Sequence, residues 1–141
     1  MLKRIYIALL EKSADFKISD FLIFTQTLLF PIQFEEFICT HTIDEEYIFG
    51  DTDVILDNNY IIGHSHYQYK IERNGYSLLN PGSVGQNRQF INEINFMIYD
   101  TTTSDVDFRS ALYEVDTIIN QMEKMDYPDI CLNYYRNKPQ K

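Results

Sequence analysis

The sequence is short of positive charge: 12 Lys and Arg stand against 21 Asp and Glu, for a formal net charge of −9. Proteins that bind nucleic acid need a surplus of cations to neutralise phosphates, so we expect no nucleic-acid partner. The simplest interpretation of the acidic balance is solubility, although an acidic surface also suits divalent cations.

Cysteine and long apolar runs are also scarce. Cys39 and Cys131 lie far apart without a pairing pattern, which indicates reduced thiols in a cytoplasm. The apolar stretch 21–34 is interrupted by polar residues and by Pro31, as in a core segment, and the run 5–10 is too short for a signal peptide. We therefore expect a soluble, cytoplasmic protein that does not enter a membrane.

The residues that are present predict a folded domain. Hydrophobic residues make up 45% of the 141 residues, with 11 Tyr and 10 Phe, enough for a core in one domain. Apolar spacing predicts helices over 2–11 and 20–29. Strands are predicted over 34–40 and 60–62, and the acidic residues 44–57 between them are expected to form a long loop with a short helix.

The second half of the chain predicts a run of strands and then a helix. Tyr67, Tyr69 and Ile71 alternate with polar residues, as in a half-buried strand, and Asn74-Gly75 is a strong hairpin signal. Further strands are predicted over 76–79, 94–99 and 108–115, followed by an amphipathic helix over 117–125. The tail, 137–141, is expected to fray.

Only three histidines occur, His41, His64 and His66, and each follows a predicted strand. Open α/β sheets bind ligands at such strand ends, and imidazole is a good ligand for Mn, Fe, Zn and Ni. On an extended backbone, the side chains of His64 and His66 leave the same side and can converge on one ion or an adjacent pair. Gly63 removes a side chain where the backbone approaches this cluster. An isolated H-x-H pattern also arises by chance, so simple hydrogen-bonded histidines remain the alternative.

The surroundings of these histidines resemble the calcineurin-like metallophosphoesterases of the small bacterial and archaeal phosphodiesterase type. Residues 61–66, Ile-Ile-Gly-His-Ser-His, are followed by the hairpin and by residues 79–88, Leu-Asn-Pro-Gly-Ser-Val-Gly-Gln-Asn-Arg. That family carries a hydrophobic strand into Gly-His-Thr/Ser-His, then Asn-Pro-Gly-Ser-x-Gly with an Arg shortly after. Residues 37–42 are similar to its strand-His-Gly motif, with Thr42 in place of the usual Gly. The resemblance covers roughly residues 18–130.

The resemblance implies an α/β fold of the α+β sandwich type: a partial metallophosphoesterase αββα fold with mostly antiparallel C-terminal strands and flanking helices. The 141 residues would form one truncated domain with a helical lead-in (1–30), a strand-rich metal-site half (31–116) and a C-terminal helix (117–136). The implied activity is hydrolysis of a phosphomonoester or phosphodiester, in which an oxygen bridging two metal ions attacks phosphorus.

The resemblance also implies site residues. His41 and His64 would bind one divalent ion and His66 the other, with manganese expected and zinc, nickel or iron as alternatives. The implied substrate-binding wall comprises Asn80, Gly82, Ser83 and Arg88. Gly82 would be free to take a positive φ, and Arg88 either contacts a phosphate or lies in solvent.

The sequence departs from the family upstream of these motifs. The family's first half supplies Asp-x-His, Gly-Asp and Gly-Asn-His, whereas no Gly, Asn or other His precedes His41. Residues 50–53, Gly-Asp-Thr-Asp, are interpreted as a loop turn, with a displaced Gly-Asp ligand as the alternative. Three imidazoles without a bridging carboxylate cannot hold two divalent ions close together. No catalytic residue is assigned.

Three interpretations follow. The chain is a phosphoesterase, inactive alone, that needs another polypeptide to supply the missing ligands. Alternatively it is a degenerate binding module that self-associates as a homo-oligomer through the sheet surface left exposed by the missing half. The third interpretation is an α+β domain with coincidental motifs. The sequence does not specify the substrate.

Overall fold

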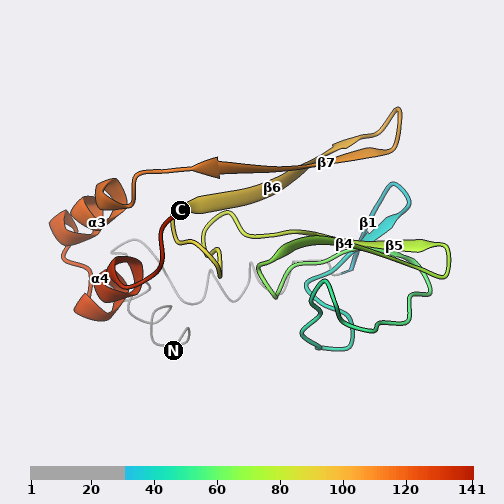
Figure 1. Cartoon of the computed structure of the whole chain (residues 1–141), viewed down its shortest axis with the longest axis horizontal. Helices are drawn as coiled ribbons and strands as arrows, with labels where there is room; N and C mark the ends of the chain where they lie inside the picture. Colours follow the sequence, from blue (N-terminus) through green and yellow to red (C-terminus); the bar gives the residue numbers. More distant parts are fainter. Residues whose placement is uncertain (1–30) are drawn as a thin grey trace, which may run out of the picture. The chain divides into compact units, whose positions relative to one another are not determined.

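The computed structural model describes residues 31–141. The helices expected over 2–11 and 20–29, which make up the lead-in 1–30, lie outside the described residues. The described chain is a mixed α/β fold with a five-stranded mixed sheet, a two-stranded antiparallel sheet and two helices (Figure 1). Residues 31–113 together with 139–141 belong to one compact unit, and residues 114–138 belong to a second.

The five-stranded sheet has the order β1-β2-β3-β5-β4. Its strands are β1 (Ile32–Phe34), β2 (Phe37–Cys39), β3 (Asn59–Ile61), β4 (Gln68–Arg73) and β5 (Tyr76–Pro81). Strands β2, β3 and β5 run parallel, while β1 and β4 pair antiparallel with β2 and β5. The carboxyl ends of the three parallel strands therefore meet at one edge of the sheet.

The hairpin at Asn74-Gly75 is confirmed. Both residues have positive φ, 54° and 82°, as a type I′ turn requires, and Arg73 pairs with Tyr76. The antiparallel pair expected around residues 100–105 is confirmed as well. It consists of β6 (Glu93–Asp100) and β7 (Asp105–Leu112).

Two expectations about residues 34–57 are wrong. The single strand over 34–40 is a hairpin, because the chain turns at Glu35 (φ 48°) and pairs Phe34 with Phe37. The loop 44–57 contains no short helix; it is irregular throughout. The loop is held in place by its buried apolar side chains Ile48 and Leu56, without a helix.

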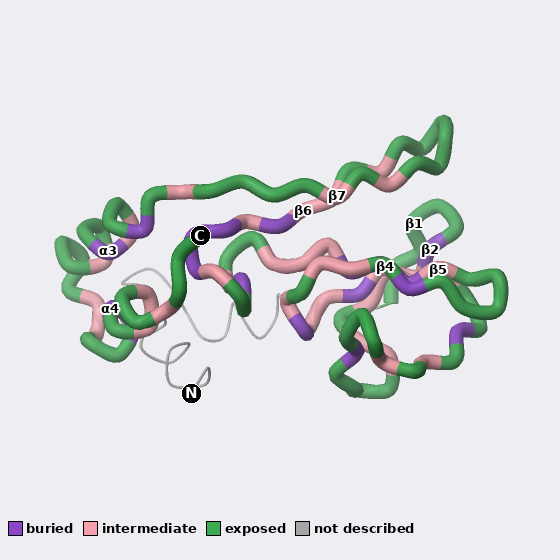
Figure 2. Tube along the Cα trace, in the orientation of Figure 1, coloured by how far each residue is buried: buried purple, intermediate pink, exposed green. Residues whose placement is uncertain are grey.

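The core of the first unit joins this loop to the sheet. Its buried side chains come from the loop, from the residue after β3 and from within β4 and β5, and they are Ile48, Leu56, Ile62, Ile71 and Leu78. Figure 2 shows that buried residues form only short segments of a chain that is otherwise mostly exposed or half-buried. Because each buried side chain contributes about 1.5–3 kcal/mol, this small cluster fixes the loop against the sheet.

The second unit contains α3 (Val115–Lys124) and α4 (Asp129–Arg136). The helix expected over 117–125 is confirmed, but the segment 117–136 is two helices, separated by residues 125–128. Pro128 cannot continue the first helix and instead precedes the second. Arg136 forms an ion pair with Glu123, which joins α4 to α3.

The expected fraying of the tail is wrong for residues 139–141. The Pro139 carbonyl accepts a hydrogen bond from Ile91 N (2.8 Å), and Lys141 N donates to Asn92 Oδ1 (2.8 Å). The Lys141 ammonium pairs with Glu93 at 2.8 Å. Backbone hydrogen bonds, which composition does not reveal, hold this segment in place.

Both cysteines are free thiols, as expected. Within residues 31–141, neither helix has the length and the apolar character needed to cross a bilayer.

Gly82, at the turn after β5, is where the fold depends most on a glycine. Its φ is +85°, and a Cβ there would lie 2.5 Å from Cβ of Asn95. The positive φ expected for Gly82 is thus confirmed. We predict that Gly82→Ala lowers the free energy of unfolding by about 1–3 kcal/mol or more, because strain and overlap add.

Urea denaturation measures this change, and Gly85→Ala is the matched control, since nothing lies within 4 Å of its Cβ position. Equal midpoints for the two variants would contradict the account of this turn.

Candidate metal centre

The structure brings His41 and His64 together. His41 follows β2 and His64 follows β3, and these strands are parallel neighbours. His64 Nδ1 lies 2.8 Å from His41 Nε2, and the two rings meet edge to face with centroids 4.8 Å apart. Two ring nitrogens therefore face each other at the carboxyl edge of the sheet, where α/β proteins place their ligands.

His66 has a different partner. Its Nδ1 lies 2.8 Å from the Gln86 carbonyl oxygen, to which it donates. The extended backbone expected through 64–66 is wrong, because both histidines have left-handed φ, 62° at His64 and 64° at His66. The two imidazoles consequently do not leave a common side of a strand. Left-handed φ at two non-glycine residues within three positions is costly and persists only where the surroundings fix it.

The electrostatics of the pair favour a neutral His64. Burial, and then the electrostatic influence of the neighbouring His41, His66 and Arg88, holds the pKa of His64 below its ordinary value. The ring of Tyr47 covers His64 with centroids 3.9 Å apart. A neutral imidazole keeps a nitrogen lone pair for a metal ion or for a hydrogen bond.

Asn80 connects the segments that carry this site. Its side chain is fully buried, and Nδ2 donates to the Gly63 carbonyl at 2.7 Å and to Ser65 Oγ at 3.1 Å. Its Oδ1 accepts from Gly82 N at 2.9 Å. Both the residue before His64 and the residue after it are thereby tied to the end of β5.

The other residues of the implied wall lie at the same end of β5. Ser83 Oγ accepts a hydrogen bond from Gln86 N at 2.9 Å, which shapes the turn that faces His66. Arg88 is exposed and, within the described part of the chain, forms no ion pair. A Cβ at Gly63 would lie 3.8 Å from His41 Nδ1, an ordinary contact, so space alone does not require the glycine expected there.

Residues 50–53 form a loop turn, in agreement with the simpler interpretation. Thr52 N donates to the Phe49 carbonyl at 3.0 Å, and Phe49 N donates to Thr52 Oγ1 at 2.8 Å.

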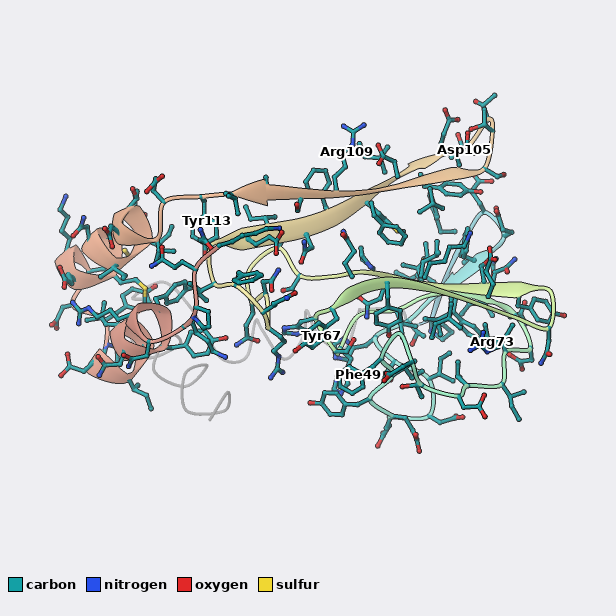
Figure 3. The ribbon with its side chains drawn as sticks, viewed as in Figure 1. Phe49, Tyr67, Arg73, Asp105, Arg109 and Tyr113 are labelled. Atoms are coloured by element: carbon teal, nitrogen blue, oxygen red, sulfur yellow. The ribbon has the colours of Figure 1, made fainter. Side chains whose placement is uncertain are left out.

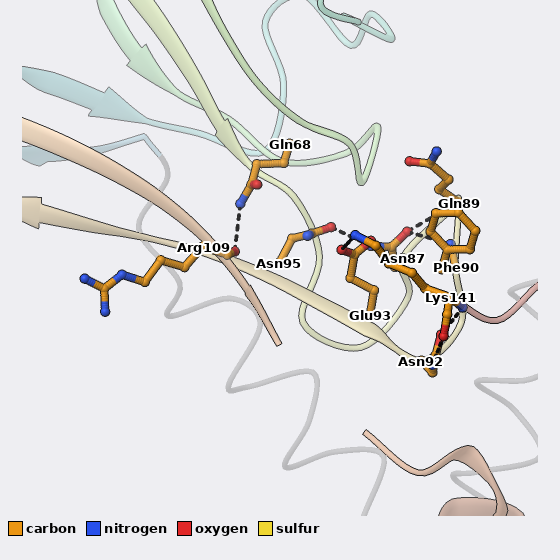
Figure 4. Close-up of polar contacts among 9 residues, drawn as sticks. All are labelled: Gln68, Asn87, Gln89, Phe90, Asn92, Glu93, Asn95, Arg109 and Lys141. Carbon is orange, nitrogen blue, oxygen red and sulfur yellow. Dashed lines mark hydrogen bonds and ion pairs between the residues drawn. The ribbon is translucent and has the colours of Figure 1, made fainter. Parts of the chain in front are cut away.

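A polar pocket of about 450 Å³ lies beside His66 and was not foreseen from the sequence. Asn87 donates to Asn95, and its Oδ1 accepts from the backbone of Gln89 and Phe90 (Figure 4). Lys141 and Glu93 form the ion pair at its wall. The partners of Asn87 lie within eight residues of it, whereas the ion pair of Glu93 with Lys141 joins residues 48 positions apart and leaves no local sequence signal.

The histidine side chains supply part of the ligand set of one metal ion, and they do not suffice for two ions. Among residues 31–141, no group of three His, Cys, Asp or Glu side chains is placed to hold a metal ion. At 2.8 Å the facing nitrogens of His41 and His64 share a hydrogen bond, so one of them carries a proton. A borderline divalent ion such as zinc would take both nitrogens as ligands once it displaces that proton. A pair of ions needs a bridging carboxylate to offset their repulsion. We therefore derive no hydrolytic step from this half-site.

No family model, no curated protein and no solved structure matches the chain.

The role of Asn80 is testable. Asn80→Ala removes the donor to the half-buried Gly63 carbonyl and the acceptor for the half-buried Gly82 N. We predict a loss of about 2–4 kcal/mol in the free energy of unfolding, because both hydrogen bonds to a fully buried carboxamide are lost together with its packing. Denaturation by urea measures it, with exposed Asn58→Ala as the control. We call these hydrogen bonds of Asn80 the clamp. If Asn80→Ala lowers the free energy of unfolding no more than the control does, the clamp is refuted.

Proposed function

We propose that this chain is a metallophosphoesterase-like protein that hydrolyses a phosphomonoester or phosphodiester once its metal site is complete. The approach of His41 and His64 to 2.8 Å at the carboxyl ends of two parallel strands is the observation that best supports this. The imidazole pair holds one divalent ion, manganese or alternatively zinc, nickel or iron. Such an ion stabilises charge that develops on phosphoryl oxygens.

The protein's own residues position the ion and its surroundings. Asn80 sets the backbone on both sides of His64, and the turn at Gly82 and Ser83 forms the adjacent wall. The exposed Arg88 lies close enough to His64 to lower its pKa, so its charge also reaches a phosphate placed beside the pair. His66 is the ligand that the family motif assigns to the second ion.

The remaining ligands come from outside residues 31–141. Because no carboxylate joins the histidines in that range, Asp and Asn or His ligands supplied from outside it, for example by a second polypeptide, complete the site in this proposal. In this account the isolated chain binds one ion and is inactive as a hydrolase.

A second function, a non-catalytic module that self-associates, is favoured by the exposed edge of the sheet. β1 is the terminal strand, and its side chains Ile32 and Phe34 are exposed. A short edge strand with apolar side chains is a template for pairing with a second copy. Both functions share this surface, since a second polypeptide can also pair there.

The metal proposal predicts unequal roles for the three histidines. Calorimetric titration with Zn²⁺ should give one ion per chain, and His41→Ala or His64→Ala should weaken binding by at least about tenfold. His66→Ala is the matched control and should leave the first ion in place, because His66 faces Gln86. If the unsubstituted protein does not bind zinc, or if zinc affinity falls equally in all three variants, His41 and His64 are not the ligand pair.

The edge-strand proposal predicts a dimer. Sedimentation velocity should show association of the unsubstituted chain, and Ile32→Glu should abolish it by placing a charge at the edge. Ile55→Glu is the control, because Ile55 is exposed on the loop 44–57 and belongs to no strand. A monomer at all concentrations contradicts self-association.

A further inference from the structure

Three exposed aromatic rings form a row that begins at the imidazole pair. These are Tyr47, Phe49 and Tyr67, which are 54%, 39% and 41% exposed, and we call them the aromatic row. Tyr47 covers His64, its ring lies 6.3 Å from that of Phe49 with only 14° between the planes, and Phe49 meets Tyr67 at 5.9 Å. Figure 3 labels Phe49 and Tyr67 next to each other on neighbouring segments. The row thus joins the loop 44–57 to the segment that carries His66.

The fold holds the row in solvent. Ile48, between the first two rings, is buried in the core, and its carbonyl accepts a hydrogen bond from the Tyr69 hydroxyl at 2.5 Å. Thr52 closes a turn on Phe49 through two further hydrogen bonds. With the backbone fixed on both sides, Tyr47 and Phe49 cannot fold back into the core. Isolated exposed apolar residues are ordinary, but two rings held outward on a fixed loop, with a third ring against them from the segment of His66, form a prepared surface.

The chemistry of the row selects a neutral planar ring. The near-parallel rings of Tyr47 and Phe49 offer flat faces for stacking. Within the described residues, the hydroxyls of Tyr47 and Tyr67 form no hydrogen bond, so they are open to the polar edge of a ligand. Asp44, Glu45 and Glu46 lie just before the row and disfavour an anion.

We propose that the aromatic row is a stacking site for a neutral planar ring, the nucleobase or aryl group of a phosphate ester whose phosphate lies at the imidazole pair. The ester part of this inference rests on the proposed phosphoesterase function, whereas binding of the ring does not. The row therefore narrows the substrate class to esters of nucleosides or of aromatic alcohols.

The test uses the full chain and a neutral ligand without phosphate. Adenosine is titrated while the ring signals of Tyr and His are followed by ¹H–¹³C NMR, with ribose as the control for the sugar. We expect saturable upfield shifts of Tyr47 and His64 with adenosine and none with ribose. 4-Nitrobenzyl alcohol distinguishes the two sources of the ring: affinity equal to adenosine supports aryl esters, and weaker affinity supports nucleosides.

Substitutions locate the site. Because base–aromatic stacking is lost on removing a ring, Tyr47→Leu with Phe49→Leu should weaken adenosine binding by about tenfold or more. Leucine keeps apolar bulk, and dispersed amide signals verify that the variant folds. Tyr76→Leu is the matched control, an exposed tyrosine at the opposite end of β5. No saturable shift with either ring compound, or unchanged affinity in the double variant, overturns the proposal.

His41→Ala separates this inference from the metal proposal. It removes one imidazole but no ring of the aromatic row, so zinc binding should fall while adenosine binding persists. If the unsubstituted protein binds adenosine but not zinc, the stacking site stands and the phosphoesterase proposal fails. If it binds zinc but neither ring compound, the stacking site fails alone.

Discussion

The buried carboxamide of Asn80 is the interaction on which the site depends. It satisfies a carbonyl at Gly63, a hydroxyl at Ser65 and an amide at Gly82, and it is itself fully buried. A lost partner in such a place costs the full desolvation of the group left behind. Since Gly63 N in turn donates to the His41 carbonyl at 3.1 Å, the clamp fixes the segments of both paired histidines. One amide thus couples the ends of three parallel strands.

That coupling explains why the two histidines of one short motif have different hydrogen-bond partners. With left-handed backbone at His64 and at His66, one ring turns to His41 and the other to the Gln86 carbonyl. Strain of this kind is found at functional sites, where the surroundings determine the backbone. The result is a two-nitrogen half-site beside a fixed aromatic surface.

Sequence rules predicted the elements whose structure depends on neighbouring residues alone. Asn74-Gly75 fixed a hairpin because only a few residues accept two positive φ values, and the strands around it followed their alternation. The left-handed backbone of His64 and His66 had no such signal, because non-glycine residues adopt it only when tertiary contacts hold them. The motif pointed to Asn80, but its role as a clamp depends on carbonyls brought together by strand pairing. The helix α4 was missed although Pro128, a start signal, precedes it.

The central claim is that the clamped pair of His41 and His64, without His66, supplies the protein nitrogens to a single ion. X-ray absorption at the zinc edge of the metal-loaded chain tests it most directly, because scattering from imidazole rings counts the histidine ligands. Two imidazoles per zinc, falling to one in His64→Ala, is the predicted result. A zinc shell without imidazole, or one that contains three, would contradict the account.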